Sequence, residues 1–203
     1  MLGIIVEELS GMSYEAYIKK NILEPLNMSK TGFSYGENNE IHDASAYTGH
    51  LELSPIDDEV LLANAYGAGS MFSTVEDLYR WDQGLKTEKL VKKETLDQIF
   101  SEHVDMFDEG YYGYGWMLID LGFDKMIYHG GNTLGFTADI TRLDELNLTV
   151  IILSNKGYVD LTNIKNNLIS IALGGEFELP KAREVVEIQN PEIYDKYVGT
   201  YDL

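Results

Sequence analysis

The sequence of 203 residues contains no cysteine, four prolines and 15 basic residues against 34 acidic ones. The absence of cysteine excludes disulfides, thiolate catalysis and thiolate metal sites. The formal net charge of −19 leaves little room for the positive face that nucleic acids and anionic membranes require. We therefore expect no nucleic-acid partner and interpret the acidic excess as a solvated surface.

Long hydrophobic runs are also missing. No apolar run approaches the ~18 residues that a membrane helix needs, so we expect no membrane segment in this chain. Residues 1–6 are too short for a signal peptide, lack a basic start and are followed by two glutamates, so none is predicted, and the compartment stays undecided. The histidines at 42, 50 and 103 show no metal-ligand spacing, and no metal site is predicted.

The first half of the chain has the apolar spacing of helices. The first predicted helix covers residues 2–10 and ends at Gly11, and the second begins at the capping residue Ser13 and stops near Pro25. Residues 27–66 are rich in turn formers and are predicted to be loops and short turns. A capping box over 73–76 predicts a third helix to residue 85, and a fourth follows at 94–100.

From residue 111 the period changes to that of strands. Four strands are predicted, with a hairpin turn at Asp144–Asn147 between the last two, and a helix over 161–171 is expected to lie on their sheet. Short connections indicate antiparallel pairing. The predicted strands are 114–121, 125–129, 136–143 and 148–154.

The expected fold class is therefore α+β, an antiparallel sheet flanked by helices plus a helical and loop-rich subdomain up to about residue 100. The expected domain covers residues 1–178. Residues 179–203 are predicted to be a linker and the start of a C-terminal appendage, with residues 197–201 as its opening strand.

The chemical signal lies in Tyr128-His129-Gly130-Gly131-Asn132, between two predicted strands. Two glycines let a backbone approach a ligand closely, and the amide that follows can donate to a developing oxyanion. A histidine can hold an anionic group or adjust a neighbouring proton. The alternative is a structural glycine-rich hairpin with a histidine at its edge.

A series of characteristic segments runs along the chain: Leu2–Gly11, Tyr17–Met28, Thr31–Phe33, Gly67–Leu78, Tyr112–Trp116, His129–Gly131 and Gly135–Phe136. Together they resemble the serine β-lactamase and penicillin-binding-protein superfamily, in particular its class C β-lactamase, esterase and D-peptidase branch. The resemblance covers residues 1 to about 175 and implies a partial β-lactamase/transpeptidase-like fold with no cofactor. Members of the family are usually bacterial and extracytoplasmic.

The family uses three motifs: Ser-x-x-Lys, Tyr-x-Asn or Ser-x-Asn, and Lys-Thr-Gly or His-x-Gly. The 203 residues contain the third alone, as His129-Gly130-Gly131. By resemblance His129 takes the place of the motif lysine, the Asn132 backbone supplies an oxyanion N–H, and Ser70 lines a wall of the pocket. Residues 30–32 spell Lys-Thr-Gly but follow a helix and a proline, so we interpret them as a surface turn.

The expected function is that of a fragment of a serine acyl-transfer hydrolase, which provides the substrate-binding strand but neither the nucleophile nor the base. Such a chain is expected to be inactive by itself. The expected ligand is a small acyl compound: a β-lactam, a D-amino-acid peptide or an ester. The alternative is a non-catalytic binding or interaction module derived from the same fold. Self-association is also expected, because the family's sheet has further strands that this chain does not contain.

Overall fold

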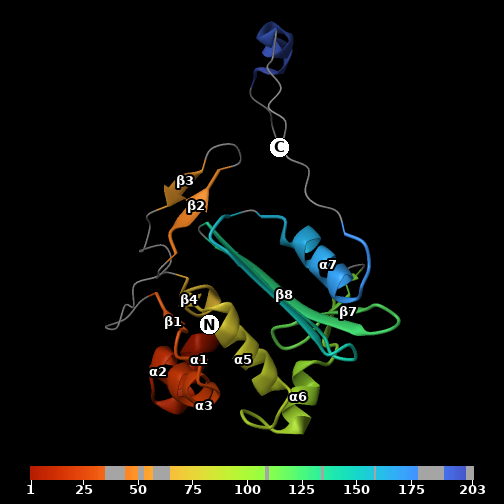
Figure 1. Cartoon of the computed structure of the whole chain (residues 1–203). Coiled ribbons are helices and arrows are strands. Elements are labelled where there is room, and N and C mark those ends of the chain that lie inside the picture. The colour runs from red at the N-terminus through yellow and green to blue at the C-terminus, as the bar shows by residue number, and fades with distance from the viewer. Residues whose placement is uncertain are drawn as a thin grey trace.

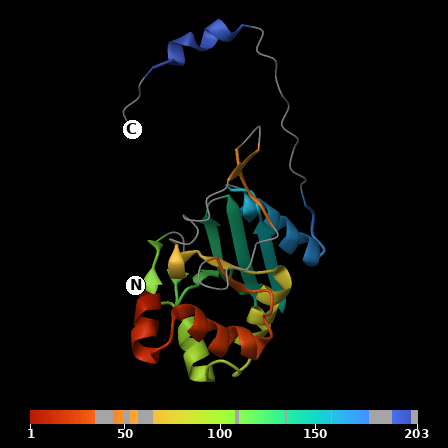
Figure 2. The ribbon, with the colours of Figure 1, turned by 90° about the vertical axis from the view of Figure 1, so that its left-hand side faces the viewer.

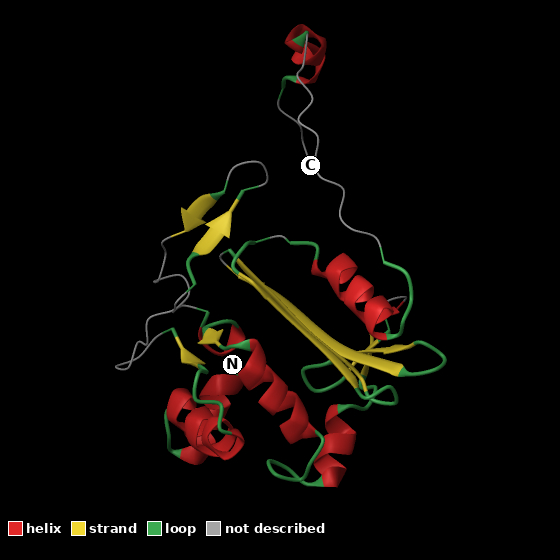
Figure 3. Cartoon of the chain, viewed as in Figure 1, coloured by secondary structure: helices red, strands yellow, loops and turns green. Residues whose placement is uncertain are grey.

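The computed structural model describes residues 1–34, 44–49, 53–56, 65–107, 110–133, 135–157, 159–177 and 190–199. Figure 3 shows the helices and strands of these parts. The helices are α1 (Leu2–Ser10), α2 (Tyr14–Ile18), η1 (Lys19–Leu23), α3 (Glu24–Leu26), η2 (Tyr66–Ala68), α5 (Val75–Leu85), α6 (Lys93–Ile99), α7 (Leu161–Ala172) and η4 (Pro191–Tyr197). The strands are β1 (Gly32–Phe33), β2 (Ala46–Thr48), β3 (Ser54–Ile56), β4 (Met71–Phe72), β5 (Val104–Asp105), β6 (Tyr111–Tyr112), β7 (Met117–Asp120), β8 (Lys125–Thr133), β9 (Phe136–Leu143) and β10 (Leu148–Ser154).

The centre of the fold is a six-stranded antiparallel sheet with the order β10-β9-β8-β7-β6-β5. Helix α7 covers one face of this sheet, and α5 and α6 lie on the other (Figure 1). Figure 2, turned by 90°, shows the strands of the sheet face-on, with α1–α3 gathered at one end of the molecule. The α+β prediction, with helices on an antiparallel sheet, is confirmed.

The main core lies between α5, α6 and the sheet. Successive side chains of a strand point to opposite faces, so one face of each central strand contributes to this core. Burial of these apolar side chains supplies the main favourable term that holds the helices on the sheet. The core is formed by Leu85, Trp116, Leu118 and Ile127, with Trp81, Leu96, Ile99, Phe100 and Ile140 packed against it.

The helix boundaries follow local signals with one correction. Gly11 adopts φ 69° at the end of α1, and the Ser13 side chain accepts a hydrogen bond from the N–H of Ala16, as predicted. Helix α5 differs, because its capping residue is Thr74, which accepts from the N–H of Asp77. The cap therefore lies one residue after the predicted Ser73, and the Asp77 carboxylate accepts from Lys30, Thr31 and Arg80.

Two of the four predicted sheet strands were wrong at their ends. Strand β8 does not stop at His129 but continues through the two glycines to Thr133, because β9 pairs with it over that whole length. Strand β7 begins at Met117 rather than at 114, since Gly115 has φ 80° and breaks the extended run. The short strands β5 and β6 were not predicted. Strands β1, β2 and β3 were also missed, since they lie within residues 27–66, which were predicted to be loops and turns. Strands β9 and β10 and the turn between them match the prediction.

The remaining parts are smaller. A second apolar cluster of Leu23, Leu26 and Met28 holds α2, η1 and α3 together. The strand predicted from residue 197 is wrong at its start, because Tyr197 closes the 3-10 helix η4; Thr200 and Tyr201 lie outside the described residues. Within the described parts, every helix is too short or too polar to cross a bilayer.

Candidate functional site

The candidate site is the second half of strand β8. On one side β9 pairs with β8 as far as Thr133, but on the other side the last pair with β7 joins Met117 to Tyr128. The segment His129–Thr133 therefore extends past the end of β7, and among the described residues no strand occupies that edge. The backbone of Gly130, Gly131 and Asn132 is exposed there.

The register indicates which backbone groups of this segment face the open edge. Strands β8 and β9 are closed by the pair Thr133 and Phe136, across a loop of two residues. The closing pair of such a hairpin directs its N–H and C=O groups toward each other, and the direction alternates along the strand. The N–H groups of Asn132 and Gly130 consequently point away from β9, toward the edge that β7 leaves open.

The two glycines have different surroundings. A Cβ atom added at Gly130 would lie 3.5 Å from the backbone oxygen of Ala138 and 3.6 Å from Oδ2 of Asp139, both ordinary contacts. A Cβ atom added at Gly131 would have no heavy atom of the described chain within 4 Å. Packing inside the chain therefore does not require glycine at 131, and its missing side chain leaves free surface in front of the strand.

The His129 side chain is half-buried and contacts a residue from a different strand. Its Nε2 atom lies 3.0 Å from the hydroxyl oxygen of Tyr112 in β6, and the two rings meet edge to face at 71°. Because side chains alternate along β8, His129 lies on the same face as Ile127, which packs on the α5 core. The histidine therefore lies on the face of the sheet that α5 and α6 cover.

A buried charge pair lies behind the glycines on the opposite face. Nζ of Lys165 in α7 is 3.1 Å from Oδ2 of Asp139, and both side chains are almost fully buried. The hydroxyl of Thr141 donates to the other carboxylate oxygen, and the ammonium lies 4.4 Å from the ring centre of Tyr128. These contacts join α7 to the strand pair that carries the site. Sequence reasoning missed them, although Lys165 interrupts the apolar face of a predicted helix.

Ser70 lies in a loop beside the end of β8. A Cβ atom added at its neighbour Gly69 would be 3.9 Å from Oγ1 of Thr133. Ser70 itself is 0% exposed, and its backbone oxygen accepts from the N–H of Ser34. The loop therefore adjoins the candidate site as expected, but the Ser70 side chain has no exposed surface and does not line an open wall in this structure.

The literal Lys-Thr-Gly of residues 30–32 lies away from β8. The N–H of Lys30 and the hydroxyl of Thr31 both donate at 2.8 Å to Oδ2 of Asp77, a fully buried carboxylate in α5. Gly32 pairs with Phe72 in the two-stranded ribbon of β1 and β4. Lys30 and Thr31 thus hydrogen-bond a buried carboxylate, in agreement with a structural interpretation of this triplet.

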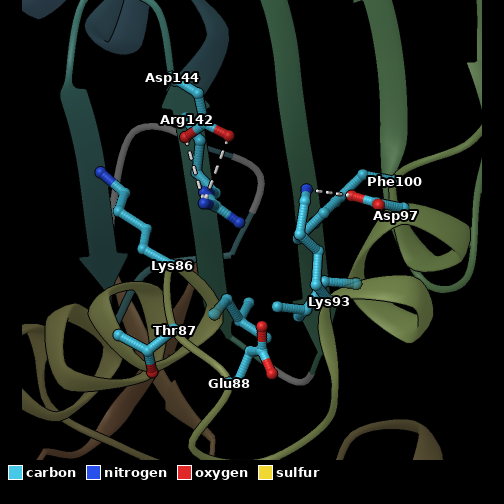
Figure 4. Close-up of a pocket in the computed structure, with 10 residues that line it drawn as sticks. Lys86, Thr87, Glu88, Lys93, Asp97, Phe100, Arg142 and Asp144 are labelled. Carbon is cyan, nitrogen blue, oxygen red and sulfur yellow. Dashed lines mark hydrogen bonds and ion pairs between the residues drawn. The ribbon is translucent and has the colours of Figure 1, made fainter.

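A separate hollow of about 460 Å³ lies between α5, α6 and β9 (Figure 4). Four of its charged groups form two ion pairs, Arg142 with Asp144 and Lys93 with Asp97. The described residues hold no group of three or more acidic or histidine side chains that fits a metal ion. His42 and His50 lie outside those residues, and His103 stacks on Tyr114 with ring centres 4.2 Å apart.

The Beta-lactamase family model matches residues 1–172. The chain belongs to that family, so the resemblance seen in the sequence is confirmed.

Individual relatives agree with this assignment. Penicillin-binding protein 4* of Bacillus subtilis is 27% identical over an aligned length of 230 residues. The alignment covers 100% of this chain and 49% of the relative. The structure of the octameric penicillin-binding protein homologue from Pyrococcus abyssi superposes with a TM-score of 0.76 at 29% identity, over 86% of this chain and 41% of that one. A D-amino acid amidase from Ochrobactrum anthropi has the same fold, with a TM-score of 0.69 at 21% identity over 85% of this chain and 56% of its own. The chain thus spans about half the length of these relatives.

Proposed function

We propose that the chain is part of a serine acyl-transfer hydrolase and supplies the substrate-side wall of its active site. The observation that carries this proposal is the open edge of β8, where His129, Gly130, Gly131 and Asn132 extend beyond the last pair with β7. An extended acyl group can add to such an edge as a further strand, using main-chain hydrogen bonds for affinity.

The proposed roles of the four residues rest on their placement along this edge. The Asn132 N–H points to the open edge and is positioned to donate to an oxyanion, and the free surface before Gly131 admits the acyl group. His129 acts through its half-buried imidazole ring. The exposed backbone of Gly130 borders the acyl group on the same edge. The neighbouring wall is formed by the loop around Gly69, with Ser70 holding that loop from inside.

The nucleophile and the base are not among these residues. The 203 residues contain no Ser-x-x-Lys and no Tyr-x-Asn or Ser-x-Asn, so the chain by itself is not expected to turn over substrate. The proposed ligand class is a small acyl compound, a β-lactam, a D-amino-acid peptide or an ester, and the mechanism needs no cofactor. The limits of the unit, residues 1–178 with an appendage beyond, remain a prediction.

Labelling with a serine-directed fluorophosphonate and a fluorescent penicillin tests this assignment. We expect the folded chain to remain unlabelled under conditions in which an intact class C β-lactamase is labelled stoichiometrically. Stoichiometric labelling of any serine here would show that the chain carries its own nucleophile. Because Ser70 is buried, a label at that residue would also contradict the placement of its loop.

The second candidate is a non-catalytic binding module with the same fold. The absence of the nucleophile motifs from these 203 residues supports this candidate as much as it supports part of an enzyme. The coding DNA upstream of Met1 discriminates between the two. An in-frame Ser-x-x-Lys and Tyr-x-Asn would identify an acyl-transfer enzyme of which this chain is a part. An upstream reading frame without these motifs would favour the binding module.

We also propose that the isolated chain self-associates. Leu2, Ile4 and Leu9 of α1 are strongly exposed, and among the described strands β10 is paired on one side alone. Exposed apolar surface and unpaired strand edges favour association, while the strong negative charge favours a small oligomer over precipitation. Light scattering at micromolar concentration in moderate salt is expected to give a defined oligomer. A stable monomer there would contradict this expectation.

A further inference from the structure

The contact between Tyr112 and His129 joins two segments that the sequence places 17 residues apart. The tyrosine hydroxyl oxygen lies 3.0 Å from Nε2 of the histidine, and the ring centres are 6.0 Å apart. A side-chain hydrogen bond of this length is well within the range of a full-strength interaction. It gives the histidine at the candidate site a defined partner at one of its two ring nitrogens.

Tyr112 is held firmly from both sides. In the sheet it pairs with Val104 of β5 and with Met117 of β7, and its backbone oxygen accepts from the N–H of His103. The next residue, Gly113, packs so closely on the end of α6 that an added Cβ atom would lie 2.5 Å from the backbone oxygen of Ile99. The tyrosine ring is therefore built on a fixed backbone.

The hydrogen bond at Nε2 decides where a neutral histidine carries its proton. A neutral imidazole has one N–H and one acceptor nitrogen, and the hydrogen bond at one nitrogen sets the state of the other. If the Tyr112 hydroxyl donates to Nε2, the proton of the ring is on Nδ1. No described residue hydrogen-bonds Nδ1, and the ring is half-buried, so Nδ1 remains available to a ligand.

We propose that Tyr112 is a positioning residue that holds His129 in its Nδ1–H form, so that Nδ1–H donates to an acceptor oxygen of the acyl ligand. The identity of that ligand rests on the proposed function, whereas the tautomer of the His129 ring does not depend on it. A lysine ammonium carries three donors and needs no such help. A neutral histidine in its place has one donor, and Tyr112 directs that donor to the ligand.

Nuclear magnetic resonance of the histidine ring nitrogens in the ¹⁵N-labelled chain tests this proposal. The spectra are recorded at about pH 8.5, a pH at which free histidine is neutral. We expect a pyrrole-like shift for Nδ1 of His129 and a pyridine-like shift for Nε2. The variant His129→Gln assigns these signals. In Tyr112→Phe we expect both nitrogens to move to intermediate shifts, as the ring samples both tautomers.

Tyr114→Phe is the matched control. Tyr114 lies two residues further along and stacks on His103 with ring centres 4.2 Å apart. This variant is expected to shift the His103 signals and to leave those of His129 unchanged. The amide spectrum of each variant reports whether the sheet is intact, so that loss of the fold is not mistaken for loss of the hydrogen bond.

Two results would overturn the proposal: a wild-type His129 ring protonated at Nε2, or a Tyr112→Phe variant with the wild-type pattern in an intact sheet. Adding N-acetyl-D-alanyl-D-alanine separates it from the proposed function. A ring in the Nδ1–H form that responds to this ligand supports both. The same ring without a response contradicts the proposed ligand and supports the positioning role.

Discussion

Asp82 in α5 and Arg142 in β9 form the most deeply buried ion pair among the described residues, and its removal should be costly. Their side chains are 0% and 2% exposed, and Nε of Arg142 lies 2.9 Å from Oδ1 of Asp82. The other carboxylate oxygen accepts from the side chains of Thr149 and Gln83. The guanidinium carbon lies 4.8 Å from the ring centre of Phe100.

The substitution Asp82→Asn keeps the size of the side chain and removes its charge. The remaining partner of Arg142 is Asp144, which is partly exposed and therefore compensates weakly. Leaving one charge of a buried pair uncompensated costs about 3–5 kcal/mol. A domain of ordinary stability has about 5–15 kcal/mol in total, so this single change removes a large share.

Urea unfolding followed by tryptophan fluorescence measures the effect without the screening that guanidinium salts introduce. With an m value of about 2 kcal/mol/M, a loss of about 3 kcal/mol lowers the midpoint by about 1.5 M. Lys93→Met is the matched control, because its pair with Asp97 is 71% and 62% exposed, and it should cost at most about 1 kcal/mol. Equal midpoints for the two variants would refute the reasoning.

Two further predictions concern the backbone. Gly135→Ala should destabilise the chain by more than about 1 kcal/mol, because φ is 80° and the new Cβ would lie 2.9 Å from backbone atoms of Tyr47. Gly131→Ala is the control and should cost less than this, because its new Cβ would meet no atom within 4 Å. Equal thermal midpoints of the two variants would contradict this prediction. Thr74→Ala should lower the free energy of unfolding in urea by about 1 kcal/mol through loss of the α5 cap, and Ser73→Ala should lower it clearly less. The reverse order would indicate that Ser73 is the capping residue.

The features that the sequence predicted well are those set by local patterns. Strands β9 and β10 were predicted to the residue, since a polar turn separates two apolar runs that each need one face buried. The end of β8 was not, because glycine lowers strand propensity and only the pairing with β9 keeps Gly130 and Gly131 extended. Strands β5 and β6 are two residues long and exist through tertiary pairing alone.

The sequence also predicted some residues of the candidate site and missed others. The motif marked the position of His129 and Asn132, because two glycines and a histidine after an apolar run are unusual. No local pattern predicted the contact of Tyr112 with His129, which depends on how β6, β7 and β8 lie side by side. The charge pair of Asp139 with Lys165 likewise depends on where α7 meets β9, which no periodicity in either segment specifies.

The central claim is that the open edge of β8 binds the acyl ligand through the Asn132 N–H. An amide titration by nuclear magnetic resonance with N-acetyl-D-alanyl-D-alanine tests it most directly. We expect selective shifts of the Gly130 and Asn132 amides, with a Kd on the order of 1 mM, about −4 kcal/mol, for half of a site. Asn132→Pro should remove the response and keep the fold, because that N–H is not part of the pairing with β9. Shifts that avoid these amides, or an unchanged response in Asn132→Pro, would contradict the claim.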